Sequence, residues 1–172
     1  MMAKNKNSSA AHPIDLDLRF KPTDKPIDPN DKRFDIFLID TGWNQAVGKV
    51  IESHLSVFFG IDNHDSYYVL SREQSVGILK RAPHLIGHDP IILVYDVRAP
   101  GDRKSRGYHG FRLNLGLIKH PSQALARLQD FLRFIALNRS VVRLDRSIRR
   151  ELYREGLDGM IKILRDASTE LL

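Results

Sequence analysis

Two segments of this chain have the composition of strands buried on both faces, and they limit the fold to one that covers a sheet on two sides. FDIFLID begins at Phe34 and IILVYDV begins at Ile91, and both are dense in branched apolar and aromatic residues. Such continuous apolar strands are typical of α/β sheets rather than of sheets with one solvated face. At 172 residues, the chain is long enough for one domain with a proper core and short for two. We therefore expect a single α/β core.

Helical periodicity separates these strands. Apolar residues recur three and four positions apart from Trp43 to Phe59, as an amphipathic helix requires. The segment YYVLS predicts another strand. Ser71 with Gln74 resembles a capping box, which predicts a helix over about 72–81. The order of elements up to the second buried strand is therefore β, α, β, α, β.

After IILVYDV, the pattern changes from alternating strands and helices to a hairpin. The segment FRLNLGLI predicts a strand antiparallel to IILVYDV, because the loop 98–110 is too short for a crossover helix. Pro121 then opens a helix with one apolar face. Beyond Asn138, helical spacing resumes over 144–152 and again over 157–164, which predicts two short helices or one bent helix.

The predicted organisation has three parts. Residues 1–32 contain four prolines and no periodicity, which predicts a flexible arm. Residues 33–138 form the core, with a four-stranded mixed sheet flanked by helices, and residues 139–172 form a basic helical extension. No apolar run approaches the roughly 20 residues of a membrane helix, and the start of the chain lacks the apolar region of a secretory signal. We expect a cytoplasmic protein with no membrane contact.

Positive charge is concentrated outside the first part of the core. The whole chain has a formal net charge of +6. Residues 34–97 hold four Lys/Arg against eight Asp/Glu, whereas the loop 98–112 holds five Lys/Arg against one Asp. Residues 139–165 hold eight Lys/Arg against four Asp/Glu. This asymmetry fits either a surface for an anionic partner or a solvated face.

The β, α, β, α, β, β, α order over about residues 34–138 resembles the thioredoxin-like fold. Trp43 falls where that family places the Trp ahead of its CxxC motif, and Pro90 falls where the family has its cis-proline. The positions that match the two cysteines are Asn44 and Val47, and the chain contains no cysteine. The resemblance therefore implies a redox-inactive member. Disulfides, thiol catalysis and thiolate metal sites are excluded on composition alone.

The resemblance also implies a place for a partner. In the family, the groove between the first core helix and the cis-proline turn accepts an extended peptide, which corresponds here to Trp43, Asn44, Val47, Asp89 and Pro90. It further implies a cis Asp89-Pro90 bond; a trans proline that starts a strand is the alternative.

A second resemblance is to response-regulator receiver domains. IILVYDV looks like their phosphoacceptor strand, with Asp96 as the acceptor, Asp40 as an acid at the end of the first strand, and Lys119 as the lysine of a Lys-Pro pair. Carboxylates at adjacent strand ends could bind Mg²⁺. However, the residues between Asp96 and Lys119 are too few for the missing helices and strand of a doubly wound sheet.

Other chemical motifs are weak. The loop IDNHDS holds Asp62, His64 and Asp65, which could ligate a metal, but polar loops commonly have this composition. The Walker loop and the G-x-G-x-x-G fingerprint are absent from the sequence. We expect no metal and no cofactor.

Basic and aromatic residues could instead contact nucleic acid or another anion. On the C-terminal segment, acidic residues alternate with the arginines and could pair with them along a solvated helix. The candidates are Arg98, Arg103, Lys104, Arg106, Tyr108, Arg112, Arg139, Arg143, Arg146, Arg150 and Arg154.

The functional hypothesis is a non-catalytic protein-interaction or regulatory module on a redox-inactive thioredoxin-like scaffold, with a protein as its partner. The alternatives are a nucleic-acid-binding protein that uses the basic segments and an atypical receiver domain phosphorylated on Asp96. The apolar stripe of the C-terminal helices could pack on its own core or support a homo-oligomer.

Overall fold

A computed structural model describes residues 27–55, 64–99, 108–155 and 160–164, with the side chains of 151–155 left undescribed. Its described elements are β1 (Phe34–Ile39), α2 (Gln45–Ser53), β2 (Ser66–Val69), α4 (Arg72–Arg81), the 3-10 turn η1 (Pro83–Leu85), β3 (Ile91–Asp96), β4 (Gly110–Asn114), the 3-10 turn η2 (Leu115–Leu117), α5 (Pro121–Leu137), α6 (Leu144–Glu155) and β5 (Ile161–Leu164).

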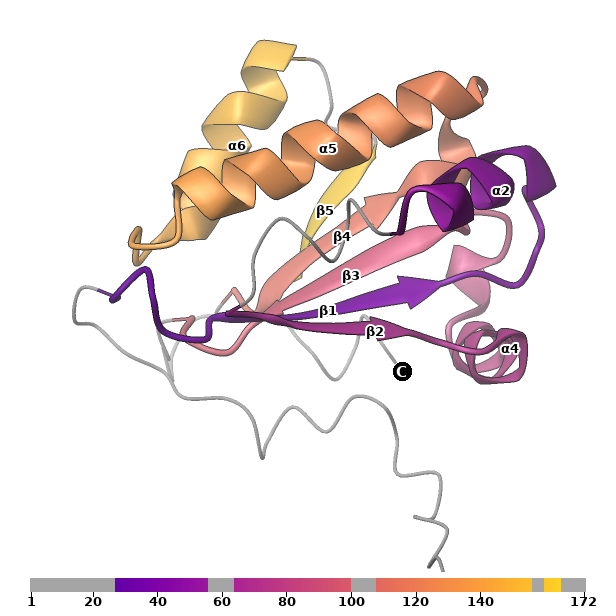
Figure 1. Ribbon diagram of the computed structural model, residues 1–172, viewed down its shortest axis with the longest axis horizontal. Helices are drawn as coiled ribbons and strands as arrows, with labels where there is room; N and C mark the ends of the chain where they lie inside the picture. The colour runs from indigo at the N-terminus through magenta and orange to yellow at the C-terminus, as the bar shows by residue number, and fades with distance from the viewer. Residues whose placement is uncertain (1–26, 56–63, 100–107, 156–159, 165–172) are drawn as a thin grey trace, which may run out of the picture.

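The five described strands form one open mixed sheet in the order β2-β1-β3-β4-β5 (Figure 1). β1 is parallel to β2 and antiparallel to β3, and each following pair is antiparallel. The register places Phe34 opposite Asp96 and Ile39 opposite Ile91. The end of β1 therefore lies beside the start of β3, and the start of β1 lies beside the end of β3.

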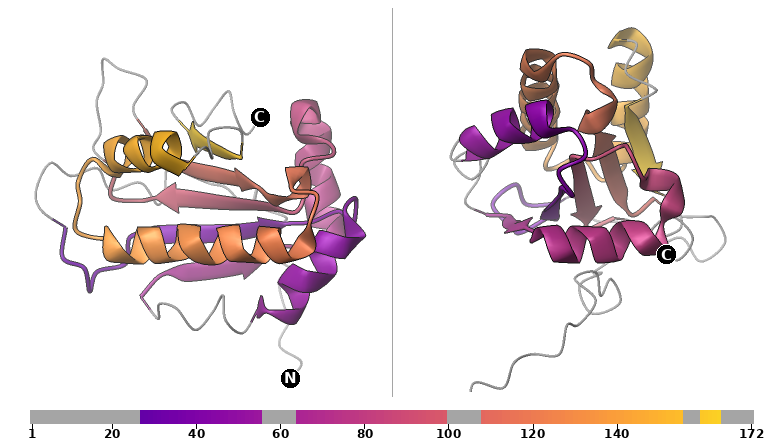
Figure 2. Two further views of the ribbon diagram at one scale, coloured as in Figure 1. Left: turned by 90° about the horizontal axis from the view of Figure 1, so that it is seen from above. Right: turned by 90° about the vertical axis from the view of Figure 1, so that its right-hand side faces the viewer.

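Helices cover the sheet on both faces, as the apolar strands require. Helices α2, α5 and α6 lie on one face and α4 lies on the other (Figures 1 and 2). Side chains of β1 alternate between the two cores: Ile36 and Leu38 pack on the first face, and Phe37 and Ile39 pack on the second. This arrangement explains why β1 is apolar at nearly every position.

Local signals predicted several elements correctly. The strands beginning at Phe34 and Ile91 and the helix over 72–81 are confirmed. The capping box is also confirmed, because the Gln74 N–H donates to Ser71 Oγ at 3.1 Å and the Ser71 N–H donates to Gln74 Oε1 at 2.9 Å.

The predicted four-stranded sheet is wrong, and so is the predicted helix where it covers 161–164, because these residues form β5 and pair with β4 as a fifth strand. Residues 157–159 of that predicted helix lie outside the described part of the chain. Ile161 packs in the first core and Leu164 in the second. A spacing of three places two residues on one face of a helix but on opposite faces of a strand. The segment MIKIL supports both readings, and pairing with the edge of β4 selects the strand.

The described apolar residues of α6 face the protein's own core. Leu144 and Ile148 are buried in the first core, against the sheet face that α5 also covers. The sequence predicted that this stripe packs either on the chain's own core or on another copy, and these two residues pack on the chain's own core.

Candidate functional site

Three loops meet at the end of the sheet where β1 finishes and β3 begins. Gly116, after β4, donates its N–H to the carbonyl of His88 at 3.0 Å, and Asn44 Nδ2 donates to the carbonyl of Gly116 at 3.3 Å. Leu115 donates its N–H to the carbonyl of Pro90 at 2.9 Å. The loops after β1, before β3 and after β4 are therefore tied together, although they are far apart in the sequence.

Glycine makes this close approach possible. A methyl group added at Gly116 would lie 2.6 Å from the carbonyl oxygen of His88 and 2.7 Å from the carbonyl carbon of Asp89. Both neighbours are backbone atoms and cannot rotate away. At Gly48 in α2, an added methyl group would lie 2.7 Å from Asp40 Oδ2, which is a side-chain atom and can move away more easily than backbone can.

Two carboxylates hold the loop that carries Trp43. Asp89 is fully buried, and its Oδ2 accepts hydrogen bonds from the N–H of Thr41 at 2.8 Å and from its hydroxyl at 2.6 Å. Asp40 Oδ1 accepts the N–H of Gly42 at 2.8 Å. The other oxygen of Asp89 has no hydrogen-bond partner among the described residues. Charged acceptors of backbone N–H groups orient a loop strongly, so these acids define the backbone of 41–42.

Burial raises the pKa of Asp40 above its ordinary value. The hydrogen bond from Gly42 opposes this shift, and the negative charges of Asp89 and Glu52 add to it, while Arg72 opposes it. Carboxylates placed close together disfavour simultaneous ionisation. Among the charges that act on Asp40, two acids, Asp89 and Glu52, therefore stand against one base, Arg72.

Trp43, the only tryptophan of the chain, is a large apolar residue and is nevertheless 68% exposed. Ile86 is 56% exposed and Leu117 is 45% exposed. These residues come from the three connected loops, and the indole Nε1 lies 3.5 Å from where a methyl group on Gly87 would be. We call Trp43, Ile86 and Leu117 the Trp43 surface. Exposed apolar residues gathered on one side of a protein are typical of interaction sites.

The other predicted groove residues lie beneath this surface. Asn44 is the N-cap of α2, with its Oδ1 accepting the Val47 N–H at 3.2 Å, so both positions are at the start of the helix. Val47, Asp89 and Pro90 are buried, and the Asp89-Pro90 bond is cis. The structure thus brings these residues to one end of the sheet, but of the five only Trp43 is exposed, while Asn44 is partly buried and the other three are buried.

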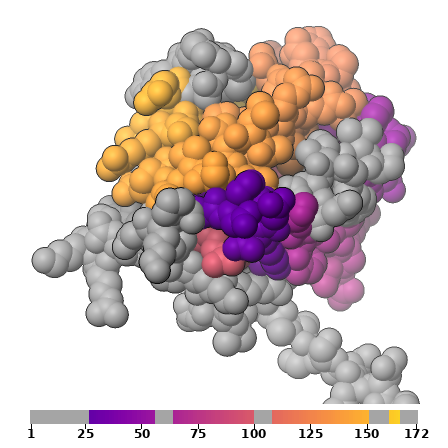
Figure 3. Space-filling model, turned by 60° about the vertical axis from the view of Figure 1, so that its left-hand side comes forward, coloured from indigo at the N-terminus to yellow at the C-terminus, as the bar shows by residue number. Residues whose placement is uncertain are grey.

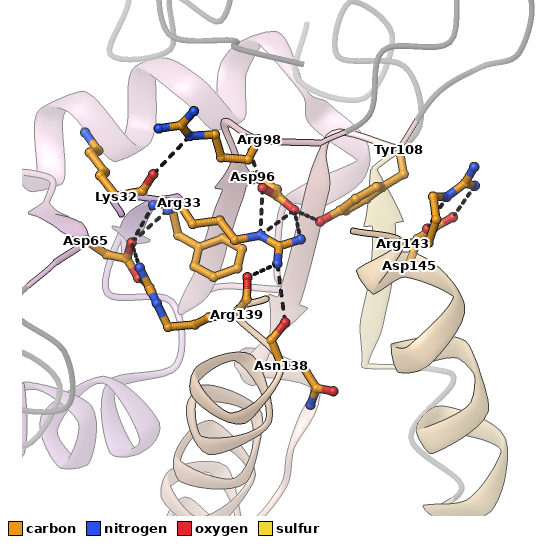
Figure 4. A network of polar contacts seen from close by, with 11 residues as sticks. Lys32, Arg33, Asp65, Asp96, Arg98, Tyr108, Asn138, Arg139, Arg143 and Asp145 are labelled. Atoms are coloured by element: carbon orange, nitrogen blue, oxygen red, sulfur yellow. Dashed lines mark hydrogen bonds and ion pairs between the residues drawn. The ribbon is translucent and has the colours of Figure 1, made fainter. Parts of the chain in front are cut away.

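The opposite end of the sheet holds a buried ionic network that the sequence did not predict (Figure 4). Arg33 Nη2 lies 2.7 Å from Asp96 Oδ2, and both side chains are fully buried. Tyr108 donates its hydroxyl to the same carboxylate oxygen, and the N–H of Arg98 donates to the other at 3.1 Å. Burial lowers the pKa of Arg33, but the hydrogen bond to Asp96 and the charge of Asp96 outweigh this effect and raise that pKa above its ordinary value. Burial, chiefly, raises the pKa of Tyr108.

A second ion pair joins this network to the helical face. Arg139 pairs with Asp65, whose Oδ1 accepts the N–H groups of Arg33 at 3.0 Å and Phe34 at 2.9 Å. Arg139 Nε also donates to the carbonyl of Pro29 at 2.8 Å. Figure 3 shows this end, where the residues that precede β1 lie against the α5 and α6 region. Asp65, which the sequence offered as a metal ligand, therefore has a structural role; Asp62 lies outside the described residues.

The receiver-like site is not assembled. Because β1 and β3 are antiparallel, Asp40 follows the end of β1 beside Ile91, whereas Asp96 lies at the other end of the sheet. Six residues of strand separate the two acids, about 20 Å at 3.3 Å per residue. Lys119 is exposed beyond η2, at the Asp40 end. A phosphoacceptor also needs solvent access, and Asp96 is buried and paired with Arg33.

The predicted anion contacts separate into different environments. Arg112 and Arg139 are 6% exposed and Tyr108 is 2% exposed, so these three are parts of the interior. Arg143 pairs with Asp145 at 3.1 Å, and Arg98 lies 3.5 Å from an oxygen of Asp31. The exposed members are on α6, at Arg146 and Arg150. Three predicted contacts, Arg103, Lys104 and Arg106, lie outside the described residues, as does the side chain of Arg154.

Fold and site together define an α/β protein whose five-stranded mixed sheet has an interior ionic network at one end and an exposed apolar surface at the other. Comparison of the chain with protein-family models, curated proteins and solved structures finds no match. Over the described parts of the chain, no helix has the length and apolar character to cross a membrane.

Proposed function

We propose that this chain is a non-catalytic protein-interaction module on a thioredoxin-like scaffold, and that it binds an extended segment of a partner at the Trp43 surface. The observation that carries the proposal is the exposure of Trp43, Ile86 and Leu117 on three loops that are hydrogen-bonded to one another. Rigidly held apolar side chains lose little conformational entropy on binding, so they are effective anchors.

The order and direction of the strands support the scaffold part of the proposal. The β2-β1-β3-β4 part of the sheet, with β1 parallel to β2 and β3 antiparallel to both neighbours, has the arrangement that the resemblance implies. Helices α2 and α5 on one face and α4 on the other also agree with it. β5 and α6 are additions to that pattern.

The test compares two exposed leucines. Peptides that bind the full chain would be selected from a random library, and their affinity would be measured by the fluorescence of Trp43 and by calorimetry. Leu117→Ser should weaken binding by roughly tenfold or more, as expected for an anchor residue. Leu137→Ser is the matched control, because Leu137 is 77% exposed but lies at the end of α5, away from the three loops. Equal loss in both variants, or in neither, would contradict the proposal.

Nucleic-acid binding is the second candidate, and the exposed arginines of α6 favour it. Arg146, Arg149 and Arg150 are exposed on one short helix. Phosphate contacts produce an affinity that falls steeply with salt. Replacement of these arginines with glutamine should abolish salt-dependent binding to a single-stranded oligonucleotide if this candidate is correct, and should leave peptide binding unchanged.

A further inference from the structure

We propose that the segment bound at the Trp43 surface is cationic, with a lysine or arginine side chain that lies against the indole of Trp43 and pairs with Asp40. This inference rests on the proposed function, and it specifies the chemistry of the partner.

The charges beneath the Trp43 surface carry the argument. Asp40 precedes Trp43 by three residues and is only partly buried, whereas Asp89 is fully buried behind it. One oxygen of Asp89 has no hydrogen-bond partner among the described residues. A buried carboxylate with an unsatisfied oxygen is costly unless a donor or cation lies nearby. A cation beside Asp40 would compensate both acids at once.

Burial and like charge act on Asp40 together. Asp89 and Glu52 both raise its pKa, against the effect of Arg72. Glu52 is exposed on α2 and Arg72 is exposed at the start of α4. The acids outnumber the base around Asp40, so an added positive charge would be favoured by electrostatic complementarity.

The indole adds a second point of recognition for a cation. Tryptophan has the most favourable aromatic face for lysine or arginine, and Trp43 is mostly exposed while its Nε1 edge lies on Gly87. The neighbouring Ile86 and Leu117 would receive apolar side chains of the same segment. A partner segment that alternates cationic and apolar residues fits this pattern.

Other charged groups border the surface. Lys119 is exposed two residues after Leu117, and His84 is exposed in η1. His88, in the loop before β3, has a pKa lowered by burial and by the charge of Arg112. These groups lie on the η1 and α5 sides, whereas Asp40 lies on the α2 side, so the cationic side chain should be directed towards α2.

Three peptides separate the inference from the proposed function. The probe is a capped pentapeptide that alternates leucine and lysine, and the comparison peptides carry glutamine or glutamate in place of lysine. Binding to the full chain would be followed by the fluorescence of Trp43, the sole tryptophan, and by calorimetry. The lysine peptide should bind roughly tenfold more tightly than the glutamine peptide, from one cation–π contact and one exposed ion pair.

Asp40→Asn should reduce the affinity for the lysine peptide part of the way towards that for the glutamine peptide, without changing the latter, because it removes the ion pair and leaves the cation–π contact with Trp43. Asp130→Asn, on the exposed side of α5, is the matched control and should change neither affinity. Equal binding of the lysine and glutamine peptides, or tighter binding of the glutamate peptide, would overturn the cationic inference and leave the peptide-binding proposal supported. Failure of all three peptides to bind, in a protein that also selects no peptide from the library, would overturn both.

Ionic quenching of Trp43 fluorescence gives a test that needs no peptide. Caesium should quench the indole more efficiently than iodide when both are compared with neutral acrylamide, because the local charge is negative. Asp40→Asn should reduce this preference. Preferential quenching by iodide in the unmodified chain would contradict the inference.

Discussion

The buried carboxylates at the two ends of the sheet differ in how many of their oxygens have hydrogen-bond partners. At the Asp96 end, the carboxylate is matched by Arg33, Tyr108 and the N–H of Arg98, so both of its oxygens have donors. At the Asp89 end, one carboxylate oxygen has no partner among the described residues and a second acid, Asp40, lies close by. At the first end the carboxylate has donors on both oxygens, whereas at the second end one oxygen of the buried carboxylate has none among the described residues.

Exposed apolar residues occur at both ends, but their arrangement differs. At the Asp96 end, Tyr108 is in the interior and Leu137 is exposed at the end of α5, whereas the other end presents Trp43, Ile86 and Leu117 to solvent from three hydrogen-bonded loops. A paired and buried network holds loops together, and an unpaired acid beside exposed apolar groups is typical of a binding surface. This difference supports the proposal that one end stabilises the fold and that the other binds a partner.

The largest expected effect is at the structural end. Arg33→Ala should destabilise the fold by about 3–5 kcal/mol, because it leaves Asp96 buried without its counter-ion. Chemical denaturation followed by circular dichroism measures this change in the free energy of unfolding. If the variant does not fold, the double variant Arg33→Met with Asp96→Leu should recover a substantial part of the loss, since it removes both charges.

A matched control uses a surface ion pair. Arg127 Nη1 lies 3.9 Å from Asp130 Oδ2, and both side chains are exposed. Arg127→Ala should therefore change the free energy of unfolding by less than about 1 kcal/mol. A similar effect of Arg33→Ala and Arg127→Ala would remove the basis for treating the Asp96 end as the stabilised end.

At the Asp89 end, the largest expected effect is at Gly116. Gly116→Ala would push against the backbone of His88 and Asp89, so it should destabilise the protein by about 1–3 kcal/mol and weaken peptide binding at the Trp43 surface. Urea denaturation and Trp43 fluorescence titration report the two effects. Normal stability with normal binding would show that the three loops are not held as closely as the contacts indicate.

Gly77→Ala is the matched substitution, because the same methyl group meets no atom within 4 Å there. Gly77 lies in the interior of α4, where alanine is favoured over glycine by about 0.5–1 kcal/mol. This variant should therefore raise the free energy of unfolding and leave peptide binding unchanged. Destabilisation at Gly77 would contradict the steric account of both glycines.

Much of the fold was predictable because short stretches of the sequence specify individual strands and helices. The apolar run of β1 and the Ser71 to Gln74 capping box specify a strand and a helix start without reference to the rest of the chain. β5 was mispredicted because Ile161 and Leu164 suit a helix or a strand equally, and only pairing with β4 decides between them.

The candidate site was predictable in part. Trp43 was placed from its position between a strand and a helix, whereas Ile86 and Leu117 were not, because neither belongs to a motif and their proximity depends on the sheet register. The Arg33–Asp96 pair had no sequence signal, since its members are 63 positions apart. Long-range pairs of this kind depend on the antiparallel alignment of β1 and β3.

The smallest expected effect is the pH dependence of Asp40, and it tests the charge excess directly. A carboxyl whose pKa is higher in the folded state than in the unfolded state binds its proton more tightly when the chain is folded. The stability of the fold therefore falls as the pH rises from about 3.8, the ordinary pKa of this carboxyl, through its raised folded-state pKa. Asp40→Asn removes this titration but keeps a side-chain oxygen for the Gly42 N–H. The gain in unfolding free energy from Asp40→Asn should therefore be small at about pH 3 and larger at about pH 7. A gain from Asp40→Asn that shrinks as the pH rises would mean that the carboxylate is compensated within the chain, and the two ends of the sheet would then no longer differ.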